Sequence, residues 1–353
     1  MKTDKRKVVL IGTGMVGMSY AYALLNQNAC DELVLIDLDR ERAQGEAMDL
    51  NHGLAFSGSN MKIYAGDYTD CGDADIVVIS AGVAQKPGES RLNLLQRNTA
   101  VFQSIIEPVA ESGFNGIFLV ATNPVDIMTW ITCKLSGFNP CRVLGSGTAL
   151  DTARLRYLVG EYFTVDPRNV HAYVIGEHGD SEFVPWSQAM FATKPILSIC
   201  EESGGRFCYQ EMERIEQEVR GAAQKIIQAK SATYYGIGMA MVRITKAIFG
   251  DENSVLTVSA MLSGEYGTNG VFVGVPCIVN RSGVRKVVSL PLNEQESSQF
   301  RKSCDTLQSF YNDLKFDKPA VLYALERKGR HATSLCGRSI NDESTRLLLS
   351  LPA

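Results

Sequence analysis

The chain of 353 residues has no hydrophobic run long enough to cross a bilayer. Its basic start, M-K-T-D-K-R-K, is followed by the short apolar run Val8 to Ile11 and then by glycines. It therefore lacks the apolar core and the cleavage site of a secretory signal peptide. These absences predict a cytoplasmic protein with no membrane partner.

Paired cysteines and a strong charge bias are also missing. The nine cysteines are an odd number and form no C-x-x-C pair, so we expect reduced thiols and no bound metal, neither a disulfide framework nor a zinc site. The net charge is only -4 and charged residues make up 21%, which gives no reason to expect a nucleic-acid partner. Internal repeats and low-complexity segments are absent.

Short apolar runs alternate with helix-like segments in the first part of the chain. These predicted strands cover residues 8–11, 33–36, 76–79 and 117–120. The alternation is typical of an α/β fold with a doubly wound, parallel Rossmann sheet. A chain of 353 residues is long enough for two cores, so we assign the first domain to residues 1–145.

The rhythm of the sequence loosens after about residue 150. The elements expected there are a helix over 211–230, strands over 270–280 and 284–290 joined by a turn, and a closing amphipathic helix. Asn293 and Glu296 form a capping-box pattern at the start of that last helix. We expect a second, α+β substrate domain over residues 146–316.

Residues 317–353 show no persistent apolar pattern and contain the basic cluster R-K-G-R. We expect this atypical tail to be poorly ordered. A disordered appendage, a partner-binding segment and read-through of unrelated sequence all fit the tail, and the sequence leaves the choice open.

A glycine-rich turn, G-T-G-M-V-G, follows the first predicted strand. Gly12, Gly14 and Gly17 have the spacing that allows a tight turn, close approach to a pyrophosphate and close helix packing. Such turns also occur for purely structural reasons. Here a strand precedes the turn, a helix follows it, and Asp37 ends the next strand, where a carboxylate binds ribose hydroxyls. The pattern predicts NAD rather than NADP, because an acid at this point repels a 2′-phosphate.

The segment G-E-H-G-D-S places His178 between glycines, and L-D-T-A-R-L-R offers it a partner. On a helix, Asp151 and Arg154 share a face, so the acid would orient the imidazole and the guanidinium would bind a carboxylate. The alternatives are a satisfied loop histidine and a surface ion pair.

Two further segments lie where ligands bind in such folds. The long connection A-G-V-A-Q-K-P-G-E-S-R-L-N is typical of a lid, and Arg91 at its end would reach a substrate carbonyl. The alternative is a solvated arginine at a helix start. The segment T-N-P-V-D places Asn123 at the carboxyl edge of the sheet.

The motifs G-T-G-M-V-G, Q-K-P-G-E-S-R, A-T-N-P-V-D, L-D-T-A-R and I-G-E-H-G-D, in this order, resemble the lactate/malate dehydrogenase family over residues 7–316. Within it, the chain is most similar to the bacterial L-lactate dehydrogenases that fructose 1,6-bisphosphate activates. The resemblance implies reversible hydride transfer between NADH and pyruvate in lactic fermentation. It also implies a homotetramer.

The resemblance also implies roles for individual residues. His178 would donate the proton, Asp151 would orient it, Arg154 would bind the substrate carboxylate, and Arg91 would polarise the carbonyl. The substrate pocket would comprise Gln85, Arg91, Asn123, Arg154 and Thr233. The NAD site would comprise Gly12, Gly14, Val16, Gly17, Asp37, Arg42, Tyr68, Gly82, Val83, Ser104, Ala121, Asn123, Ser146 and Ile237. Regulation would involve Arg156 and His171.

Two rival functions remain. A malate dehydrogenase would need a second cation for the distal carboxylate of oxaloacetate. Malate dehydrogenases resemble one another in carrying an arginine at the loop position that the neutral Gln85 occupies here, so the resemblance favours pyruvate. Lys86 is a nearby cation, and larger 2-keto acids stay open as substrates. The other rival is a non-catalytic NAD-binding protein.

Arg156 lies two residues after Arg154 in the same predicted helix. If Arg154 faces the substrate, Arg156 points the opposite way, because two helical residues span about 200°. From spacing alone it is a solvated arginine or part of a local ion pair. With His171 it matches the sugar-bisphosphate site of the allosteric enzymes, so we expect activation by fructose 1,6-bisphosphate.

Overall fold

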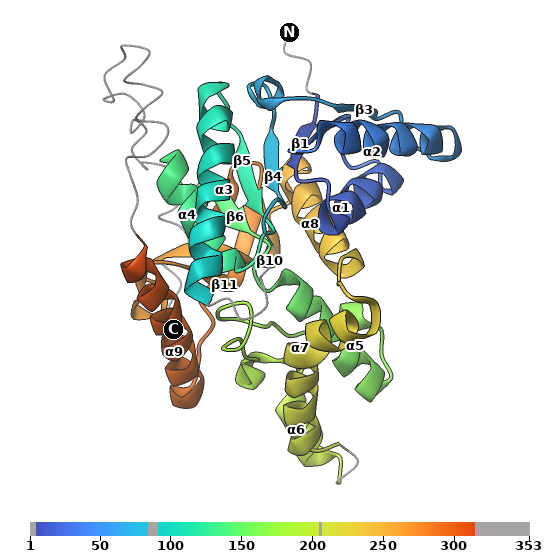
Figure 1. The fold of residues 1–353 in the computed structure, drawn as a ribbon. Helices are drawn as coiled ribbons and strands as arrows, with labels where there is room; N and C mark the ends of the chain where they lie inside the picture. The colour runs from blue at the N-terminus through green and yellow to red at the C-terminus, as the bar shows by residue number, and fades with distance from the viewer. Residues whose placement is uncertain (1–4, 84–90, 205–206, 315–353) are drawn as a thin grey trace, which may run out of the picture.

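A computed structural model shows how these segments are arranged in space (Figure 1). It describes residues 5–83, 91–204 and 207–314, and only the backbone of residues 91 and 92. The tail and Gln85 lie outside the described residues. None of the helices in these three segments combines the length and the apolar character that crossing a membrane requires.

A nine-stranded sheet runs through the molecule in the order β12-β11-β10-β6-β5-β4-β1-β2-β3. Its parallel strands are β1 (Lys7–Ile11), β2 (Glu32–Ile36), β3 (Lys62–Ala65), β4 (Ile76–Ile79), β5 (Ile117–Val120) and β6 (Val143–Gly145). Every residue of β1, β2, β4 and β5 is buried, because helices cover both faces. The order of the parallel strands is that of a Rossmann fold, which confirms the predicted fold class.

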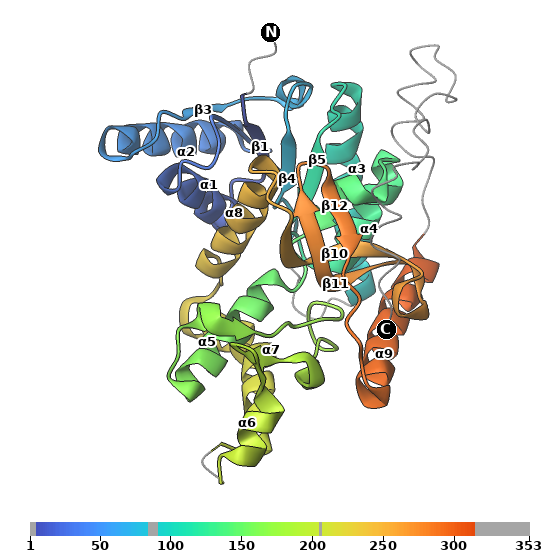
Figure 2. The same ribbon diagram turned by 180° about the vertical axis from the view of Figure 1, so that it is seen from behind.

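Helices form a layer on each face of the sheet (Figures 1 and 2). One layer contains α1 (Met15–Asn26), α2 (Arg40–Gly53) and α8 (Tyr235–Phe249). The other contains α3 (Arg91–Glu111), α4 (Val125–Ser136) and α9 (Glu294–Asp313). The predicted capping box starts α9: the Asn293 side chain accepts from the Glu296 N–H, and the Glu296 carboxylate accepts from the Asn293 N–H. Tyr311 of α9 stacks on Trp130 of α4, with ring centroids 4.2 Å apart, and closes this layer.

The strands of the second half join the same sheet instead of forming a separate one. They are antiparallel: β10 (Ser254–Ser263), β11 (Asn269–Asn280) and β12 (Gly283–Val287). Ser259 of β10 pairs with Gly145 of β6, so the added strands cover an edge of the parallel sheet that would otherwise expose unpaired backbone groups. The last strand ends at Val287, three residues before the predicted end.

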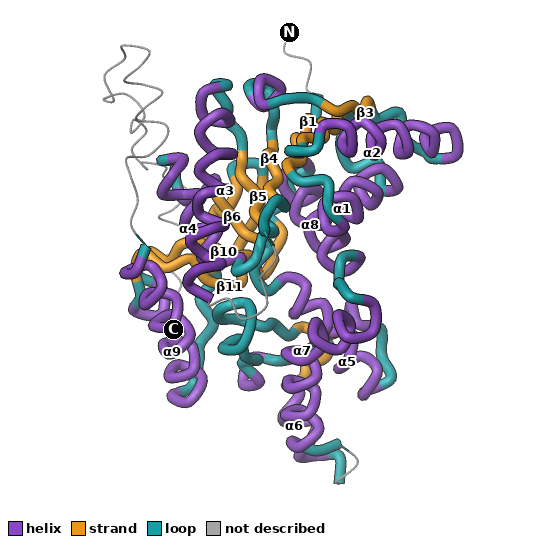
Figure 3. The backbone as a smooth tube through the Cα atoms, viewed as in Figure 1, coloured by secondary structure: helices purple, strands orange, loops and turns teal. Residues whose placement is uncertain are grey.

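A smaller lobe lies below the sheet in Figure 1 and Figure 3. It contains α5 (Ala149–Phe163), α6 (Ile196–Glu202), α7 (Tyr209–Lys230) and a sheet of β7 (Val170–His171), β8 (Met190–Phe191) and β9 (Lys194–Pro195). Leu155, Val159 and Ile215 belong to a core separate from that of the large sheet. Because α5 also contacts β10 and α8, it joins the lobe to the sheet.

Candidate active site

The carboxyl ends of the parallel strands meet along one edge of the sheet. The residues that directly follow them keep hydrogen bonds to the neighbouring strand: Gly12 N–H donates to Ile36, Ala121 to Ile79 and Ser146 to Val120, at 2.8, 2.9 and 2.8 Å. The predicted NAD-site residues Gly12, Asp37, Gly82, Val83, Ala121, Asn123 and Ser146 therefore lie at this edge, where nucleotides bind in open α/β sheets.

The glycine-rich turn between β1 and α1 has room only for glycine at two positions. Gly12 has φ +102°, and a Cβ there would lie 2.6 Å from the Ala81 nitrogen. A Cβ on Gly17 would lie 2.1 Å from the Gly12 oxygen. Gly14 begins α1 with open space around it, and no described side chain caps this helix. The free N–H groups of the first turn of α1 thus fit the pyrophosphate of a dinucleotide.

Asp37 is held in place at the end of β2. Its Oδ2 accepts hydrogen bonds from the Thr13 N–H and Oγ1 at 2.7 and 2.9 Å, and its Oδ1 accepts from the Asp39 N–H at 3.0 Å. Burial raises the pKa of Asp37, but these hydrogen bonds and the charge of Arg42 outweigh burial and leave the pKa below its usual value. The carboxylate is ionised, with lone pairs left for ribose hydroxyls.

The other predicted NAD-site residues are spread over neighbouring elements and do not all lie at the carboxyl edge of the sheet. Val83 donates its N–H to Asn98 of α3 at 2.9 Å, so Asn98, which sequence reasoning missed, holds the start of the long connection. Val16 and Tyr68 are half-buried, and Arg42 is exposed. Ser104 lies exposed on α3 with its hydroxyl bonded to Val101 of its own helix, so no described contact links it to the sheet edge.

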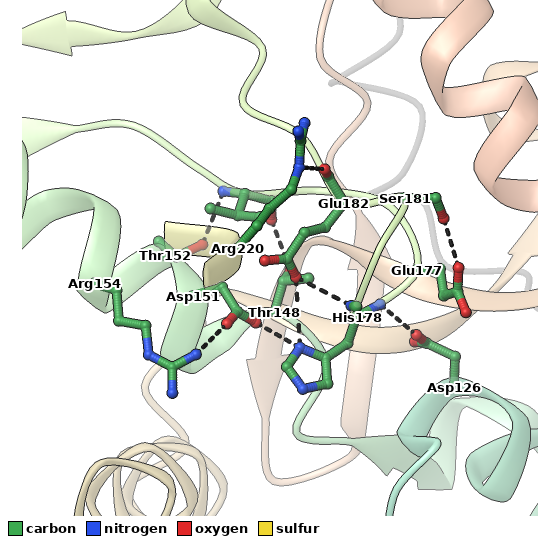
Figure 4. Close-up of polar contacts among 12 residues, drawn as sticks. Asp126, Thr148, Asp151, Thr152, Arg154, Glu177, His178, Ser181, Glu182 and Arg220 are labelled. Carbon is green, nitrogen blue, oxygen red and sulfur yellow. Dashed lines mark hydrogen bonds and ion pairs between the residues drawn. The ribbon is translucent and has the colours of Figure 1, made fainter. Parts of the chain in front are cut away.

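The loop that carries His178 is tied to four elements. Gly176 exchanges backbone hydrogen bonds with Gly274 of β11 at 2.9 and 3.1 Å. The Glu177 N–H donates to Ser303 of α9 at 2.6 Å, and the His178 N–H donates to Asp126 of α4 at 2.8 Å. The imidazole then meets α5, so the loop has one determined position between the two cores (Figure 4).

His178, Asp151 and Arg154 form a continuous polar chain. The imidazole Nδ1 lies 2.7 Å from Asp151 Oδ2, and Arg154 Nη1 donates to Asp151 Oδ1 at 2.7 Å (Figure 4). The Asp151 side chain is 1% exposed, whereas that of His178 is 24% exposed. Each oxygen of the Asp151 carboxylate thus holds one partner, while part of the His178 side chain stays accessible.

The electrostatics of this chain favour a protonated imidazole. Burial lowers the pKa of His178, but the charge and hydrogen bond of Asp151, with Glu182 in support, raise the pKa well above the usual histidine value. Burial raises the pKa of Asp151, but His178 and Arg154 outweigh burial and lower that pKa. The pair is therefore an imidazolium and a carboxylate, suited to proton donation.

Sequence reasoning missed two carboxylates of this site. Asp126, in the quoted T-N-P-V-D segment, holds the His178 backbone. Glu182 is 3% exposed and its Oε2 lies 3.5 Å from His178 Nδ1. In the sequence, Glu182 is visible only as an acid four residues after His178 in G-E-H-G-D-S-E. In a loop this spacing does not predict a contact, so only the folded structure shows that the two side chains meet.

A hydrogen bond explains the short contact between His178 and Asp151 better than a metal ion does. Ligand atoms of Asp151, His178 and Glu182 lie within 4.8 Å of one another. The 2.7 Å between Nδ1 and Oδ2 is a hydrogen-bond distance, shorter than the roughly 3.3 Å between two ligands of tetrahedral zinc.

The remaining predicted residues lie just before and within α8, after β5 and at the start of α3. A Cβ on Gly236 would lie 2.8 Å from Leu150 of α5, so α8 begins against the helix that carries Arg154. Thr233 and Ile237, on either side of this contact, are half-buried, and Asn123 is exposed after β5. Arg91 begins α3, but only its backbone is described.

Arg156 points away from the Arg154 side of α5, as the helix geometry predicts. Its Nε donates to the Ala172 carbonyl at 3.1 Å, and its guanidinium lies 5.2 Å from the centre of the Tyr173 ring. His171 is exposed at the end of β7, next to Ala172. Arg156 therefore contacts the two residues that directly follow His171, on the side of α5 away from the Asp151–Arg154 pair.

Comparisons with known proteins agree with this architecture. Residues 6–145 match the family model of the lactate/malate dehydrogenase NAD binding domain, and residues 148–315 match that of the lactate/malate dehydrogenase alpha/beta C-terminal domain. The chain is 52% identical over 308 residues to L-lactate dehydrogenase 2 of Bacillus cereus, covering 87% of this chain and 98% of the relative. It is 55% identical over 303 residues to the L-lactate dehydrogenase of Bacillus caldolyticus, covering 86% and 95%.

Solved structures give the same result. A lactate dehydrogenase from a Medee basin deep-sea metagenome library superimposes with a TM-score of 0.86 at 52% identity, over 88% of this chain and 98% of that one. The ligand-bound minor L-lactate dehydrogenase of Enterococcus mundtii has a TM-score of 0.87 at 45% identity, over 89% and 100%.

Proposed function

Because the chain belongs to the lactate/malate dehydrogenase family and residues 6–145 are its NAD-binding domain, we propose that it is an L-lactate dehydrogenase. It would reduce pyruvate to L-lactate and catalyse the reverse reaction. The observation that carries this proposal is the polar chain of His178, Asp151 and Arg154, with both contacts at 2.7 Å. When bound, the nicotinamide supplies the hydride.

The residues of the polar chain have separate tasks in this reaction. Negative charge develops on the keto oxygen of pyruvate, and the Nε2–H of protonated His178 donates a proton to it. Asp151 holds the Nδ1 side of the ring and so fixes which nitrogen faces the substrate. Arg154 uses one Nη1 hydrogen for Asp151 and keeps its other donors for the substrate carboxylate.

Other groups complete the pocket in this proposal. Asn123 would hydrogen-bond the substrate oxygen, Thr233 would line the pocket, and Ile237 would pack against the nicotinamide. Arg91 would stabilise the charge on the carbonyl oxygen, since it begins the helix that follows the long connection. The neutral Gln85 favours pyruvate over the dicarboxylate oxaloacetate.

The test is the loss of NADH absorbance in the presence of the purified protein and a panel of keto acids. We expect turnover with pyruvate to exceed turnover with oxaloacetate and with larger 2-keto acids. A preference for oxaloacetate would show a malate dehydrogenase instead. Binding of NADH without turnover of any keto acid would show a non-catalytic protein.

We also propose that fructose 1,6-bisphosphate activates the enzyme as a homotetramer. Burial lowers the pKa of Arg156, and its contacts within the described segments are with the Ala172 carbonyl and the Tyr173 ring, not with a carboxylate. The charge of Arg156 therefore lacks a counter-ion that a phosphate would provide. With His171, the same groups from two subunits would repel one another until a bisphosphate bridges them.

Rates against pyruvate concentration, with and without the bisphosphate, test this regulation. Coupling of about 1–3 kcal/mol predicts a 5- to 150-fold gain in apparent pyruvate affinity. Arg156→Gln should abolish the response. Arg168→Gln is the matched control, because Arg168 is exposed and pairs with Asp166. An unresponsive wild type, or equal response of Arg156→Gln, would contradict the proposal.

A further inference from the structure

A second carboxylate faces the nitrogen of His178 that Asp151 already binds. Glu182 Oε2 lies 3.5 Å from His178 Nδ1, against 2.7 Å for Asp151 Oδ2. Figure 4 shows the two acids approaching the ring from α5 and from the histidine loop itself. The single N–H at Nδ1 donates its hydrogen bond to the closer Asp151, so Glu182 acts on the ring through its charge.

Glu182 is buried and held in place by hydrogen bonds. Its side chain is 3% exposed. The Gly179 N–H donates to its Oε2 at 3.4 Å, and Arg220 of α7 donates to its backbone oxygen at 2.8 Å. These contacts hold the carboxylate against the imidazole.

The two arginines described near Glu182 form ion pairs with other carboxylates, and this leaves His178 as the counter-ion of Glu182. From α5, Arg154 is bonded to Asp151. From α7, Arg220 forms its ion pair with Glu216. From α4, Asp126 accepts from the His178 backbone.

Among the side chains that the structure describes, the rest of the surroundings adds no cation. Glu177 of the same loop accepts from Ser181 at 2.6 Å, and Ser303 of α9 is neutral. Within the part of the chain that the structure describes, the only ion pair of the Glu182 carboxylate is therefore with His178.

We propose that Glu182 is a positioning residue of proton transfer, whose negative charge stabilises the protonated imidazole of His178 and so extends keto-acid reduction to higher pH. The inference rests on the proposed function, because it specifies how that reaction depends on pH. No covalent step is added. The proton still passes between His178 Nε2 and the substrate oxygen.

The protonation of Glu182 follows from the same contacts. The pKa of Glu182 is raised to about 7, mainly by burial. The hydrogen bond and charge of His178 oppose this rise in pKa, and the charge of Asp151 adds to it. Glu182 thus gains its charge near neutral pH, and above that range the charge favours the imidazolium. The two groups titrate as a coupled pair, so kinetics report the pair and not either group alone.

The test is the pH dependence of Glu182→Gln, which removes the charge and keeps an oxygen that accepts from Gly179. In the variant, the midpoint at which kcat/KM for pyruvate falls with rising pH should move down by about one unit, as expected for loss of an opposite charge at this distance. Lactate oxidation needs a neutral imidazole, so its acid limb should move down by the same amount. A defect in folding alone lowers both rates without moving either midpoint.

Two variants control the result. Glu182→Asp keeps the charge and should keep the midpoint near that of the wild type. Glu177→Gln removes an equally buried loop carboxylate that bonds Ser181 instead of facing the imidazole, and it should leave the midpoint unchanged. An unmoved midpoint in Glu182→Gln, or an equal shift in Glu177→Gln, would overturn the inference.

A measurement independent of turnover separates this inference from the proposed function. Diethyl pyrocarbonate modifies neutral imidazoles, and mass spectrometry identifies His178 among the four histidines of the chain. The pH midpoint of His178 modification should fall by the same amount in Glu182→Gln. Inactivity of the wild type on pyruvate would refute the proposed function, while an equal midpoint of modification in the wild type and Glu182→Gln would refute the role of Glu182.

Discussion

The Asp126 carboxylate accepts a hydrogen bond from the backbone N–H of His178 at 2.8 Å, across 52 residues of sequence. Asp126 lies in the first turn of α4, directly after β5 and Asn123, whereas His178 lies beyond β7. The NAD-binding domain therefore holds the loop that carries the proposed proton donor. Burial raises the pKa of Asp126 to about 6, against the nearby Ser259 hydroxyl and the His178 N–H, which lower it.

Asp126 makes the stability of the protein depend on pH in a predictable direction. Its pKa is higher in the folded protein than the ordinary 3.8, so its contribution to stability is present in acid and is lost as pH rises through about 6. Asp126→Asn keeps an oxygen for the His178 N–H and has no such loss. We expect the free energy of unfolding of the variant, relative to wild type, to increase by on the order of 1 kcal/mol between pH 5 and 7.5. Urea unfolding at both pH values measures it, and a difference that stays constant or decreases would contradict the assignment.

His178→Ala should remove the proton donor and leave the cofactor site intact. We expect kcat for pyruvate reduction to fall by about 10²- to 10⁴-fold, the usual worth of a general acid. NADH affinity, measured by fluorescence titration, should stay near that of the wild type. His52→Ala is the control, because His52 is an exposed histidine in the last turn of α2. Turnover within a few-fold of wild type in His178→Ala would refute its role.

Gly17 and Gly45 are both helical glycines with opposite surroundings. A Cβ on Gly17 would meet the Gly12 oxygen at 2.1 Å, whereas a Cβ on Gly45 of α2 would meet nothing within 4 Å. Gly17→Ala should destabilise the protein by about 1–3 kcal/mol and weaken NADH binding, because the turn must move. Gly45→Ala should stabilise it by about 1 kcal/mol, because alanine favours helices. Thermal unfolding of both variants, with and without NADH, tests the pair, and equal effects would contradict the steric argument.

Gln85→Arg tests the choice between pyruvate and oxaloacetate. The new cation should raise kcat/KM for oxaloacetate relative to pyruvate by about 10- to 100-fold, the worth of a charged hydrogen bond. Lys86→Arg keeps the neighbouring charge and should leave the preference unchanged. An unaltered ratio in Gln85→Arg would place the selection of substrate elsewhere in the pocket.

A chain that ends after Phe316 should remain folded and active. The buried residues Phe300, Leu307 and Tyr311 all lie within α9, which ends at Asp313. Removal of the residues beyond 316 should change the free energy of unfolding by no more than about 0.5 kcal/mol, as for a surface change. A chain that ends after Leu292 loses α9 and should not fold. Circular dichroism and the pyruvate assay distinguish the two, and unfolding of the longer chain would contradict the prediction.

Local patterns predicted the main elements well. The runs 76–79 and 117–120 are β4 and β5 as observed, and the capping box of Asn293 and Glu296 starts α9. These signals depend only on neighbouring residues: a strand buried on both faces is a continuous apolar run, and a cap acts within one helical turn. The continuation of the sheet through β10, β11 and β12 left no such mark, because a strand has the same pattern whichever edge it joins.

The site divides in the same way. The sequence by itself determined the glycine turn, Asp37 at the end of β2 and the spacing of Asp151 and Arg154, since each follows from a strand end or from helical periodicity. Only the tertiary structure brought His178 to Asp151, placed Asp126 beneath its backbone and set Glu182 against its ring. Those contacts join a loop to α4 and α5, and the burial that raises the pKa of Glu182 to about 7 exists only after the two cores have packed together. Local sequence patterns thus identify some of the site residues, whereas the pKa values of His178, Asp151 and Glu182 depend on contacts that form only in the folded protein.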